Sequence, residues 1–156
     1  MVEGRLAAAL YMQRVSGVEA VEGQQYARVS EAHAPSGRVL QLVAIVTDPQ
    51  FAGMGLGREL KAFALHAARL DSSIDLVVGV TRCRNYKGWH GGMEEYISEY
   101  TRGGVEDPGL DFHARDGARL VRAVPGFRPE DTDNGGAGVL LEYEVKLRGP
   151  EEAPRG

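Results

Sequence analysis

The sequence is poor in cysteine: Cys83 is the only one among its 156 residues. A single thiol cannot form an internal disulfide, and it excludes any metal site built from several cysteines. The other side chains offer no coherent ligand set, so we expect no metal. Lone cysteines are most often small buried hydrophobic residues. Because Arg82 and Arg84 flank this one and would favour a thiolate, a nucleophilic role stays open as a minor alternative.

Long apolar runs and an excess of positive charge are also missing. No run reaches the roughly 20 apolar residues that a membrane-spanning helix needs, and the N-terminus is too weakly basic and apolar for a signal peptide. The 18 Lys and Arg against 22 Asp and Glu leave a formal net charge of −4. That balance argues against nucleic acid as the main partner. These absences predict a cytoplasmic protein that binds neither membranes nor nucleic acid.

The chain is long enough for one domain with its own hydrophobic core. Hydrophobic residues make up 43% of the sequence, which is ordinary for a globular protein. We assign residues 1–148 to this single domain. The segment 149–156, GPEEAPRG, is rich in proline, glycine and charge, so we expect it to be disordered.

Glycine is unusually dense in VTDPQFAGMGLGREL, residues 46–60, where Gly53, Gly55 and Gly57 alternate with other residues. Glycine lets backbone N–H groups approach a ligand that a side chain would block, and a helix beginning there points its first N–H groups the same way. The spacing is not the G-x-G-x-x-G of dinucleotide folds, and the G-K-S/T of a P-loop is absent. It predicts an anion site for phosphate, with a ligand-free tight turn as the alternative.

The residues around this loop predict a strand, turn, helix and strand in one βαβ unit. A Val-, Ile- and Leu-rich strand covers 38–49 and ends at Pro49. The segment 56–70 predicts an amphipathic helix, and 74–82 reads as a strand covered on both faces. The apolar residues at helical spacing in 56–70 are Leu56, Leu60, Phe63, Ala64, Ala67 and Leu70.

Weaker patterns predict the remaining elements. Met93, Ile97 and Tyr100 lie at helical spacing. In DPGLDFHARDG, Asp107 is a plausible helix N-cap and Pro108 suits the first helical position. Strands are expected in 7–15, in ARLVRAVPGF and in 138–147, while QQYARVSEA reads as a weak strand or a loop.

The valine-rich strand, the Asp-Pro pair, G-x-G-x-G-R-x-L and the helix, residues 44–60, resemble the acyl-coenzyme A site of the GNAT acyltransferase superfamily. In that family the loop amides and the helix N-terminus hold the pyrophosphate of coenzyme A. The resemblance implies an α/β GNAT fold, with a mixed, mostly antiparallel sheet that splays near the loop to admit pantetheine. Ala52 stands where the family usually has Arg or Gln, which weakens the expected grip on phosphate. The implied cofactor-binding residues are Ile45, Val46, Gly53, Gly55, Leu56, Gly57 and Arg58.

Four further sequence segments resemble one particular group of domains within this superfamily. VTRCRNY, MEEYI, FHARDGA and PGFRPEDTDNGGAGVLLEYE look like the GNAT-like decarboxylase domains of polyketide synthase loading modules, of the curacin type. The similarity runs from about Leu10 to Tyr143. Those domains decarboxylate malonyl or methylmalonyl thioesters, and some are credited with passing the acyl group to an acyl carrier protein. The resemblance implies that Thr81 and His113 form the catalytic pair and that Arg128 assists them.

The chemistry of decarboxylation suits these three residue types. Loss of CO2 from a malonyl thioester leaves an enolate, so the barrier falls when the developing oxyanion is stabilised. Thr81 can donate a hydrogen bond, His113 can hold the thioester oxygen or protonate the carbanion, and Arg128 can capture the carboxylate with its planar fork. Each has a simpler interpretation: a β-branched strand residue, a half-buried helix histidine and a solvated loop cation.

We therefore predict a malonyl- or methylmalonyl-thioester decarboxylase with S-acyl transfer as a further step, using coenzyme A or the phosphopantetheine of a carrier protein. One alternative is an N-acetyltransferase acting on a small amine, for which only Glu94, Glu95 and Glu142 offer a base. A second alternative is a non-catalytic acyl-coenzyme A-binding module. Few residues precede Leu10, where the family carries an N-terminal lobe, so we expect that lobe to be short or absent. A homodimer is left open.

Overall fold

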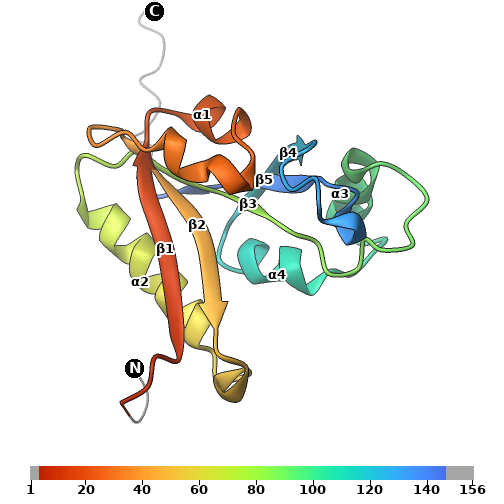
Figure 1. Cartoon of the computed structure of the whole chain (residues 1–156), viewed down its shortest axis with the longest axis horizontal. Helices are drawn as coiled ribbons and strands as arrows, with labels where there is room; N and C mark the ends of the chain where they lie inside the picture. Colours follow the sequence, from red (N-terminus) through yellow and green to blue (C-terminus); the bar gives the residue numbers. More distant parts are fainter. Residues whose placement is uncertain (1–3, 147–156) are drawn as a thin grey trace, which may run out of the picture.

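The computed structural model describes residues 4–146, so the expected disorder of 149–156 falls outside the described part of the chain. A five-stranded sheet with the order β1-β2-β3-β5-β4 forms its centre (Figure 1). The strands are β1 (Ala8–Val15), β2 (Val39–Thr47), β3 (Leu76–Thr81), β4 (Arg119–Val124) and β5 (Gly138–Glu144). The helices are α1 (Val18–Glu22), α2 (Leu56–Leu70), α3 (Met93–Arg102) and α4 (Pro108–Ala114), with 3-10 turns η1 (Tyr26–Ala32), η2 (Pro49–Phe51) and η3 (Thr132–Asn134).

The predicted mixed, mostly antiparallel sheet is confirmed. β2 and β3 are parallel and joined by α2, whereas β1 with β2, β3 with β5, and β4 with β5 are antiparallel. A parallel pair needs a crossover, and the helix after the glycine loop supplies it. The helix covers Leu56–Leu70, as its apolar spacing predicts. None of the helices in the described part of the chain has the length and apolarity to cross a membrane.

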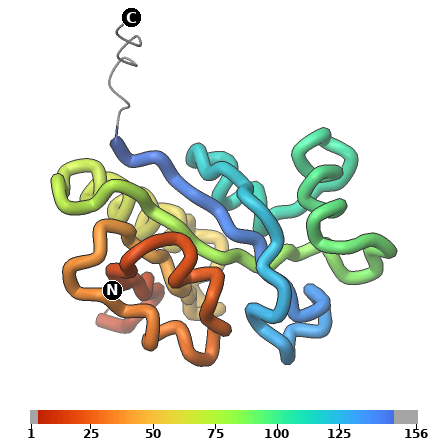
Figure 2. The backbone as a smooth tube through the Cα atoms, turned by 90° about the horizontal axis from the view of Figure 1, so that it is seen from above, coloured from red at the N-terminus to blue at the C-terminus, as the bar shows by residue number. Residues whose placement is uncertain are grey.

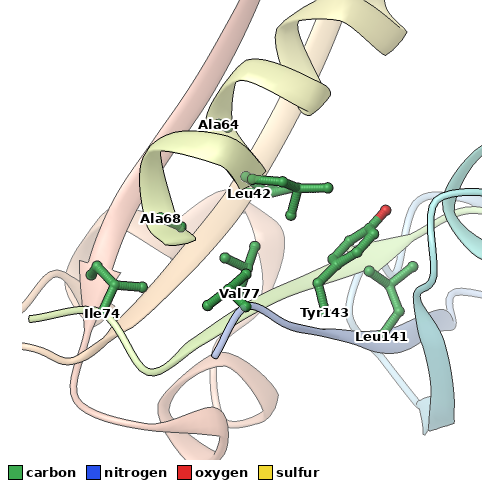
Figure 3. Packing of buried hydrophobic residues seen from close by; sticks show 9 residues of the cluster. Leu42, Ala64, Ala68, Ile74, Val77, Leu141 and Tyr143 are labelled. Carbon is green, nitrogen blue, oxygen red and sulfur yellow. The ribbon is translucent and has the colours of Figure 1, made fainter. Parts of the chain in front are cut away.

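Helices cover both faces of the sheet. α2 packs on one face against a cluster that includes Leu42, Val77 and Leu141 (Figure 3). On the opposite face, α1 and η1 cover Val15 and Val78. Seen from above, the N-terminal segment in red and orange lies along one side of the strands (Figure 2). A third cluster joins α3 and α4 to the far end of β5.

β2 separates from β3 halfway along its length. The two strands pair from Val39 opposite Leu76 as far as Leu42 opposite Gly79, and β2 then continues alone to Thr47. The separation begins at a β-bulge, because Tyr11 pairs with Ala44 and the next residue of β1 pairs with Leu42, leaving Val43 as an extra residue on β2. A bulge bends and twists its strand. The described structure therefore has the splayed sheet that the sequence predicts beside the glycine loop.

Two local predictions differ from the structure. Residues 26–32 form a 3-10 helix rather than the weak strand or loop expected for QQYARVSEA. Val15 of β1 makes an isolated bridge with His33, directly after this helix, and Tyr26 packs on Phe127. The buried face of α2 is also rotated from the predicted one. Phe63 is 68% exposed and Leu70 is exposed, whereas the fully buried side chains of this helix include Lys61.

Candidate active site

The glycine loop has the backbone geometry of an anion site. Gly53 and Gly55 have φ angles of 81° and 76°, the left-handed region that favours glycine, and no atom lies within 4 Å of where their Cβ atoms would be. Gly55 is the N-cap of α2. The first N–H groups of a helix have no partner within it, so those of Leu56, Gly57 and Arg58 are available to a ligand. This geometry fits the predicted binding of a pyrophosphate.

Gly57 allows α2 to approach both the splayed strand and α4. A Cβ atom at this position would lie 3.2 Å from Cγ2 of Ile45 and 3.9 Å from Cζ of Phe112. The side chain of Ile45 thus points at the start of α2, and the next residue, Val46, points to the other face of β2 and is exposed. The start of α2, the unpaired end of β2 and Phe112 of α4 therefore meet.

α4 is fixed at its start by a buried carboxylate, as its sequence predicts. Asp107 is fully buried and accepts hydrogen bonds from the N–H groups of Gly109 and Leu110 at the start of the helix, at 2.8 and 3.1 Å. It also accepts from the N–H groups of Arg84 and Asn85, at 2.9 and 3.0 Å. Burial alone would raise the pKa of Asp107, but a hydrogen bond from the Tyr96 hydroxyl at 2.6 Å, together with these backbone bonds, holds it below its usual value. The loop after β3 and the helix carrying His113 are therefore joined through one side chain.

His113 lies on α4 and pairs with a tyrosine that the sequence reasoning missed. Its Nδ1 is 2.6 Å from Oη of Tyr143 on β5. The Tyr143 hydroxyl ends away from the aliphatic side chains around its ring (Figure 3). Burial raises the pKa of the Tyr143 hydroxyl, so it stays protonated at neutral pH. The alternation of residues in 138–147 could have identified Tyr143 from the sequence. It places Tyr143 on the inner face of the strand, where a buried hydroxyl needs a hydrogen-bond partner.

The imidazole of His113 is neutral at neutral pH. Burial lowers its pKa to about 4, and the positive charge of Lys61 acts in the same direction while Asp116 opposes it. We assign the Tyr143 hydroxyl as donor to Nδ1, since the hydroxyl has no other acceptor among the described residues. That assignment leaves the proton of the imidazole on Nε2. A neutral imidazole of this tautomer donates one hydrogen bond at Nε2.

Thr81 ends β3 on the same face of the sheet as Tyr143. It pairs with Val139, and Val77 on the same strand pairs with Tyr143, so both positions point toward α2 and α4. No hydrogen bond in residues 4–146 joins Thr81 to His113; the Thr81 hydroxyl donates to the carbonyl of Arg82 at 3.3 Å. The rise of a strand puts Thr81 about 13 Å along β3 from Val77. The predicted pair shares a face of the sheet without a hydrogen bond between the two side chains in the described residues.

Arg128 lies beside the tip of β3 and contacts η1, which covers the face of the sheet opposite to the one that carries Thr81 and Tyr143. Its guanidinium stacks on the ring of Tyr26, with Cζ 3.6 Å from the ring centroid, and its Nε is buried without a hydrogen-bond partner. It lines a cavity of about 330 Å³ together with Arg82, whose charge is paired with Asp131 at 2.5 Å. None of the ion pairs in the described part of the chain includes Arg128. It is therefore a free planar cation in a cleft.

The structure removes Cys83 as a nucleophile. The residue is 5% exposed, its sulfur lies 3.8 Å from that of Met93, and its N–H donates to Oδ1 of Asn134 at 2.9 Å. Burial raises the pKa of the Cys83 thiol to about 12, and the carboxylate of Asp107 adds to this shift. A thiol with this pKa does not form the thiolate at neutral pH. Of the two neighbouring arginines, Arg82 is paired with Asp131.

The glutamates considered as bases for an N-acetyltransferase have other structural contacts. Glu142 accepts from Arg119 at 2.6 Å, and Glu94 accepts from the N–H of Ala123 at 2.7 Å on the edge strand β4. Glu95 lies near Gly91, where its carboxylate would be 2.3 Å from an added Cβ atom. None of the hydrogen bonds in residues 4–146 connects these carboxylates to His113 or to the glycine loop.

Two solved structures share this fold and a large part of this sequence. The GphF GNAT-like decarboxylase in complex with isobutyryl-CoA is 40% identical, with a TM-score of 0.83, over 93% of this chain and 75% of that one. The loading GNATL domain of CurA from Lyngbya majuscula is 35% identical, with a TM-score of 0.85, over 93% of this chain and 74% of that one. No family model matches the sequence.

Two curated proteins of Bacillus subtilis are more distant. The probable hydrolase YhcX is 27% identical over 125 residues, which are 79% of this chain, and the uncharacterized N-acetyltransferase YkwB is 26% identical over 114 residues, which are 72%. The chain spans 24% of the first protein and 50% of the second. The match to the two solved structures is thus both the more complete and the more similar.

Proposed function

This chain belongs to the GNAT superfamily, and from that premise we propose that it decarboxylates malonyl or methylmalonyl thioesters. The identity of 35–40% with two GNAT-like domains, one of them a decarboxylase by name, supports this reaction above the other chemistries of the fold. S-acyl transfer to a carrier protein is the further step that we include, because a loading domain is one of the two relatives.

The pairing of His113 with Tyr143 is the observation that carries the proposal. Decarboxylation requires a group that stabilises an enolate oxygen and does not require a strong base. A neutral imidazole with its proton on Nε2 supplies such a hydrogen bond, and the protonated Tyr143 hydroxyl at Nδ1 selects this tautomer. An imidazole that stays neutral down to a pH of about 4 keeps this role across the physiological range.

The proposed step balances with one proton from water as its only co-reactant. The electron pair of the bond between the carboxylate carbon and Cα moves into the thioester, which releases CO2 and forms an enolate. Nε2–H of His113 donates to the enolate oxygen, and Thr81 donates to the departing carboxylate or the thioester. The enolate carbon then takes a proton from water, giving the acyl thioester with one carbon fewer. Arg128 binds the carboxylate of the substrate before it leaves, through its unpaired guanidinium.

Coenzyme A or a carrier protein brings the thioester by the same phosphopantetheine arm. The open glycine loop and the unpaired N–H groups at the start of α2 fit its phosphates, and the unpaired part of β2 offers backbone groups to the pantetheine amides. The complex of GphF with isobutyryl-CoA supports a site of this kind in the fold.

An N-acetyltransferase is the second candidate, because YkwB carries that name. That reaction needs a base to deprotonate an ammonium group, and an effective base has a pKa near the working pH. His113, with a pKa of about 4, is a poor base for this purpose. Glu94 and Glu142 already accept hydrogen bonds from other residues. These contacts favour the decarboxylase.

Incubation with malonyl-coenzyme A in the absence of any amine tests the proposal. We expect conversion to acetyl-coenzyme A, followed by mass spectrometry, with methylmalonyl-coenzyme A giving propionyl-coenzyme A. Consumption of acetyl-coenzyme A only when an amine is added would establish the N-acetyltransferase instead. Tight binding of both thioesters without either reaction would leave a non-catalytic binding module. The same assay with a malonyl-loaded carrier protein identifies the preferred carrier of the thioester.

The replacement Arg128→Gln tests the carboxylate site. We expect KM for malonyl-coenzyme A to rise about 10- to 100-fold, since one charge-assisted contact with the substrate carboxylate is lost. The Kd for acetyl-coenzyme A, which has no such carboxylate, should not change. Arg119→Gln is the matched control, because Arg119 is an exposed arginine on β4 that is paired with Glu142 of β5. Equal weakening of both ligands by Arg128→Gln would remove Arg128 from carboxylate recognition.

A further inference from the structure

Lys61 is a lysine inside the protein. Its side chain is 0% exposed, although lysine is almost never fully buried unless it is paired. Its ammonium donates to the carbonyl of Phe112, forms an ion pair with Asp116 at 2.8 Å and lies 3.7 Å from the centroid of the Phe112 ring. All three contacts belong to α4 or to the turn that follows it. Lys61 thus binds one segment of the chain through a carbonyl, a carboxylate and a ring.

These contacts join α2, which begins at the glycine loop, to α4, which carries His113. Lys61 lies on the second turn of α2, and the first turn of this helix directly follows the glycine loop. Phe112 precedes His113 in the sequence, and its ring reaches Gly57 in the first turn of α2. The carbonyl bound by Lys61 and the imidazole that pairs with Tyr143 therefore belong to adjacent residues. A shift of α4 along α2 would move His113 and break the contacts of Lys61 together.

Stability alone gives a weak reason for a buried lysine here. Removing a charge from water costs several kcal/mol, and well-packed apolar residues often replace buried ion pairs without loss of stability. Burial lowers the pKa of the Lys61 ammonium, and the hydrogen bond to Asp116 opposes that shift. An apolar side chain on α2 would fill this space but would not fix the position of the Phe112 carbonyl along α2. The Lys61 ammonium fills the space and also fixes that carbonyl through a directional hydrogen bond.

We propose that Lys61 is a positioning residue of this site, whose buried ammonium locks α4 against α2 and so holds His113 at a fixed place relative to the glycine loop. The inference rests on the proposed decarboxylation for its consequence in catalysis, but the lock itself is a property of the fold. It assigns a role to a residue that contacts neither the glycine loop nor Tyr143.

The two charged groups of this lock, Lys61 and Asp116, also act on the pKa of His113. The charged groups that act on its imidazole are Lys61 from α2 and Asp116 from the turn after α4, while Tyr143 from β5 is uncharged. Lys61 disfavours the imidazolium and Asp116 favours it. The two groups that hold α4 in place are therefore expected to move the pKa of His113 in opposite directions when they are removed.

The replacement Lys61→Met tests the inference, because it keeps an unbranched buried chain and removes the ammonium. We expect the pKa of His113, followed by NMR of the imidazole carbons, to rise by about one unit or more from its value of about 4. We expect kcat for malonyl-coenzyme A to fall about 10- to 100-fold through misplacement of the imidazole, with KM changed by less than about threefold. Arg69→Met is the matched control, since Arg69 is an exposed cation on the last turn of α2.

Asp116→Asn separates a lock from a merely loosened core. Loss of the carboxylate should leave the pKa of His113 where it is or lower it, because Asp116 favours the imidazolium. A general loosening would admit water and raise the pKa of His113 in both variants. A rise in Lys61→Met without a rise in Asp116→Asn supports the lock. An unchanged pKa in a folded Lys61→Met protein, or a rise in both variants, overturns it.

These outcomes are distinct from failure of the proposed function. If the unaltered protein does not turn over malonyl-coenzyme A, the function is wrong, yet the titration of His113 still decides the role of Lys61. If Lys61→Met does not fold, Asp116→Asn alone decides, because the lysine remains: a pKa of His113 that is not raised supports the lock, and a raised one overturns it.

Discussion

His113→Ala is expected to lower the rate of malonyl-thioester decarboxylation about 100- to 1,000-fold, the usual loss when one oxyanion donor is removed. The variant should still bind coenzyme A, because the glycine loop and the start of α2 do not contain His113. The rate is measured by mass spectrometry of acetyl-coenzyme A, and binding by calorimetry. His66→Ala is the matched control, since His66 is an exposed histidine on α2. An unchanged rate would remove His113 from the mechanism.

The pH dependence of kcat distinguishes the two roles that the sequence left open for His113. If the neutral imidazole holds the oxyanion, kcat should stay level between about pH 5.5 and 8.5, because burial lowers the pKa of His113 to about 4 and the ring remains neutral throughout. If the imidazolium had to protonate the carbanion with an ordinary pKa, kcat would fall as the pH rises through about 6.5. A falling profile of that kind would contradict the oxyanion role.

Gly55→Val is expected to weaken coenzyme A binding about 10- to 100-fold. The residue has a φ of 76°, and a side chain there costs about 1–2 kcal/mol in the left-handed region. Relaxation of that strain would turn the N–H groups at the start of α2 away from the phosphates, with a loss of about 1.5–3 kcal/mol for each charge-assisted hydrogen bond. Calorimetry with coenzyme A measures the change.

Gly103→Val is the matched control for this strain. Gly103 has a φ of 83°, ends α3 and has open space around its Cβ position, as Gly55 has. Both variants should lose similar stability, measured as a lower Tm, while only Gly55→Val should lose affinity for coenzyme A. Equal affinities in the two variants would mean that the turn at 53–57 does not bind the phosphates.

The strings that carry the family resemblance have structural as well as chemical roles. In TRCRNY, Arg82 pairs with Asp131, the N–H of Cys83 donates to Asn134, and the next two N–H groups donate to Asp107. These bonds connect the end of β3 to two segments that lie far along the chain. These contacts hold the tip of β3, α4 and the 128–134 loop together.

Local sequence determined the elements around the phosphate site. Alternating glycines before a run of helical spacing require a turn followed by a helix, and the helix covers Leu56–Leu70. Asp107 and Pro108 likewise begin α4 where the sequence places them. These signals are complete within a few residues, because backbone conformation, capping and the periods of helix and strand are local properties.

Tertiary structure alone decided which side chains act together. Tyr143 meets His113 across 30 residues and Lys61 meets Phe112 across 51, and no local period encodes either contact. It also decided that Lys61 is buried while Phe63 is exposed, against the hydrophobic pattern of α2. Burial, and with it the pKa of His113, depends on which elements pack around a residue. That packing is fixed only when the sheet, with its bulge at Val43, brings α2 and α4 side by side.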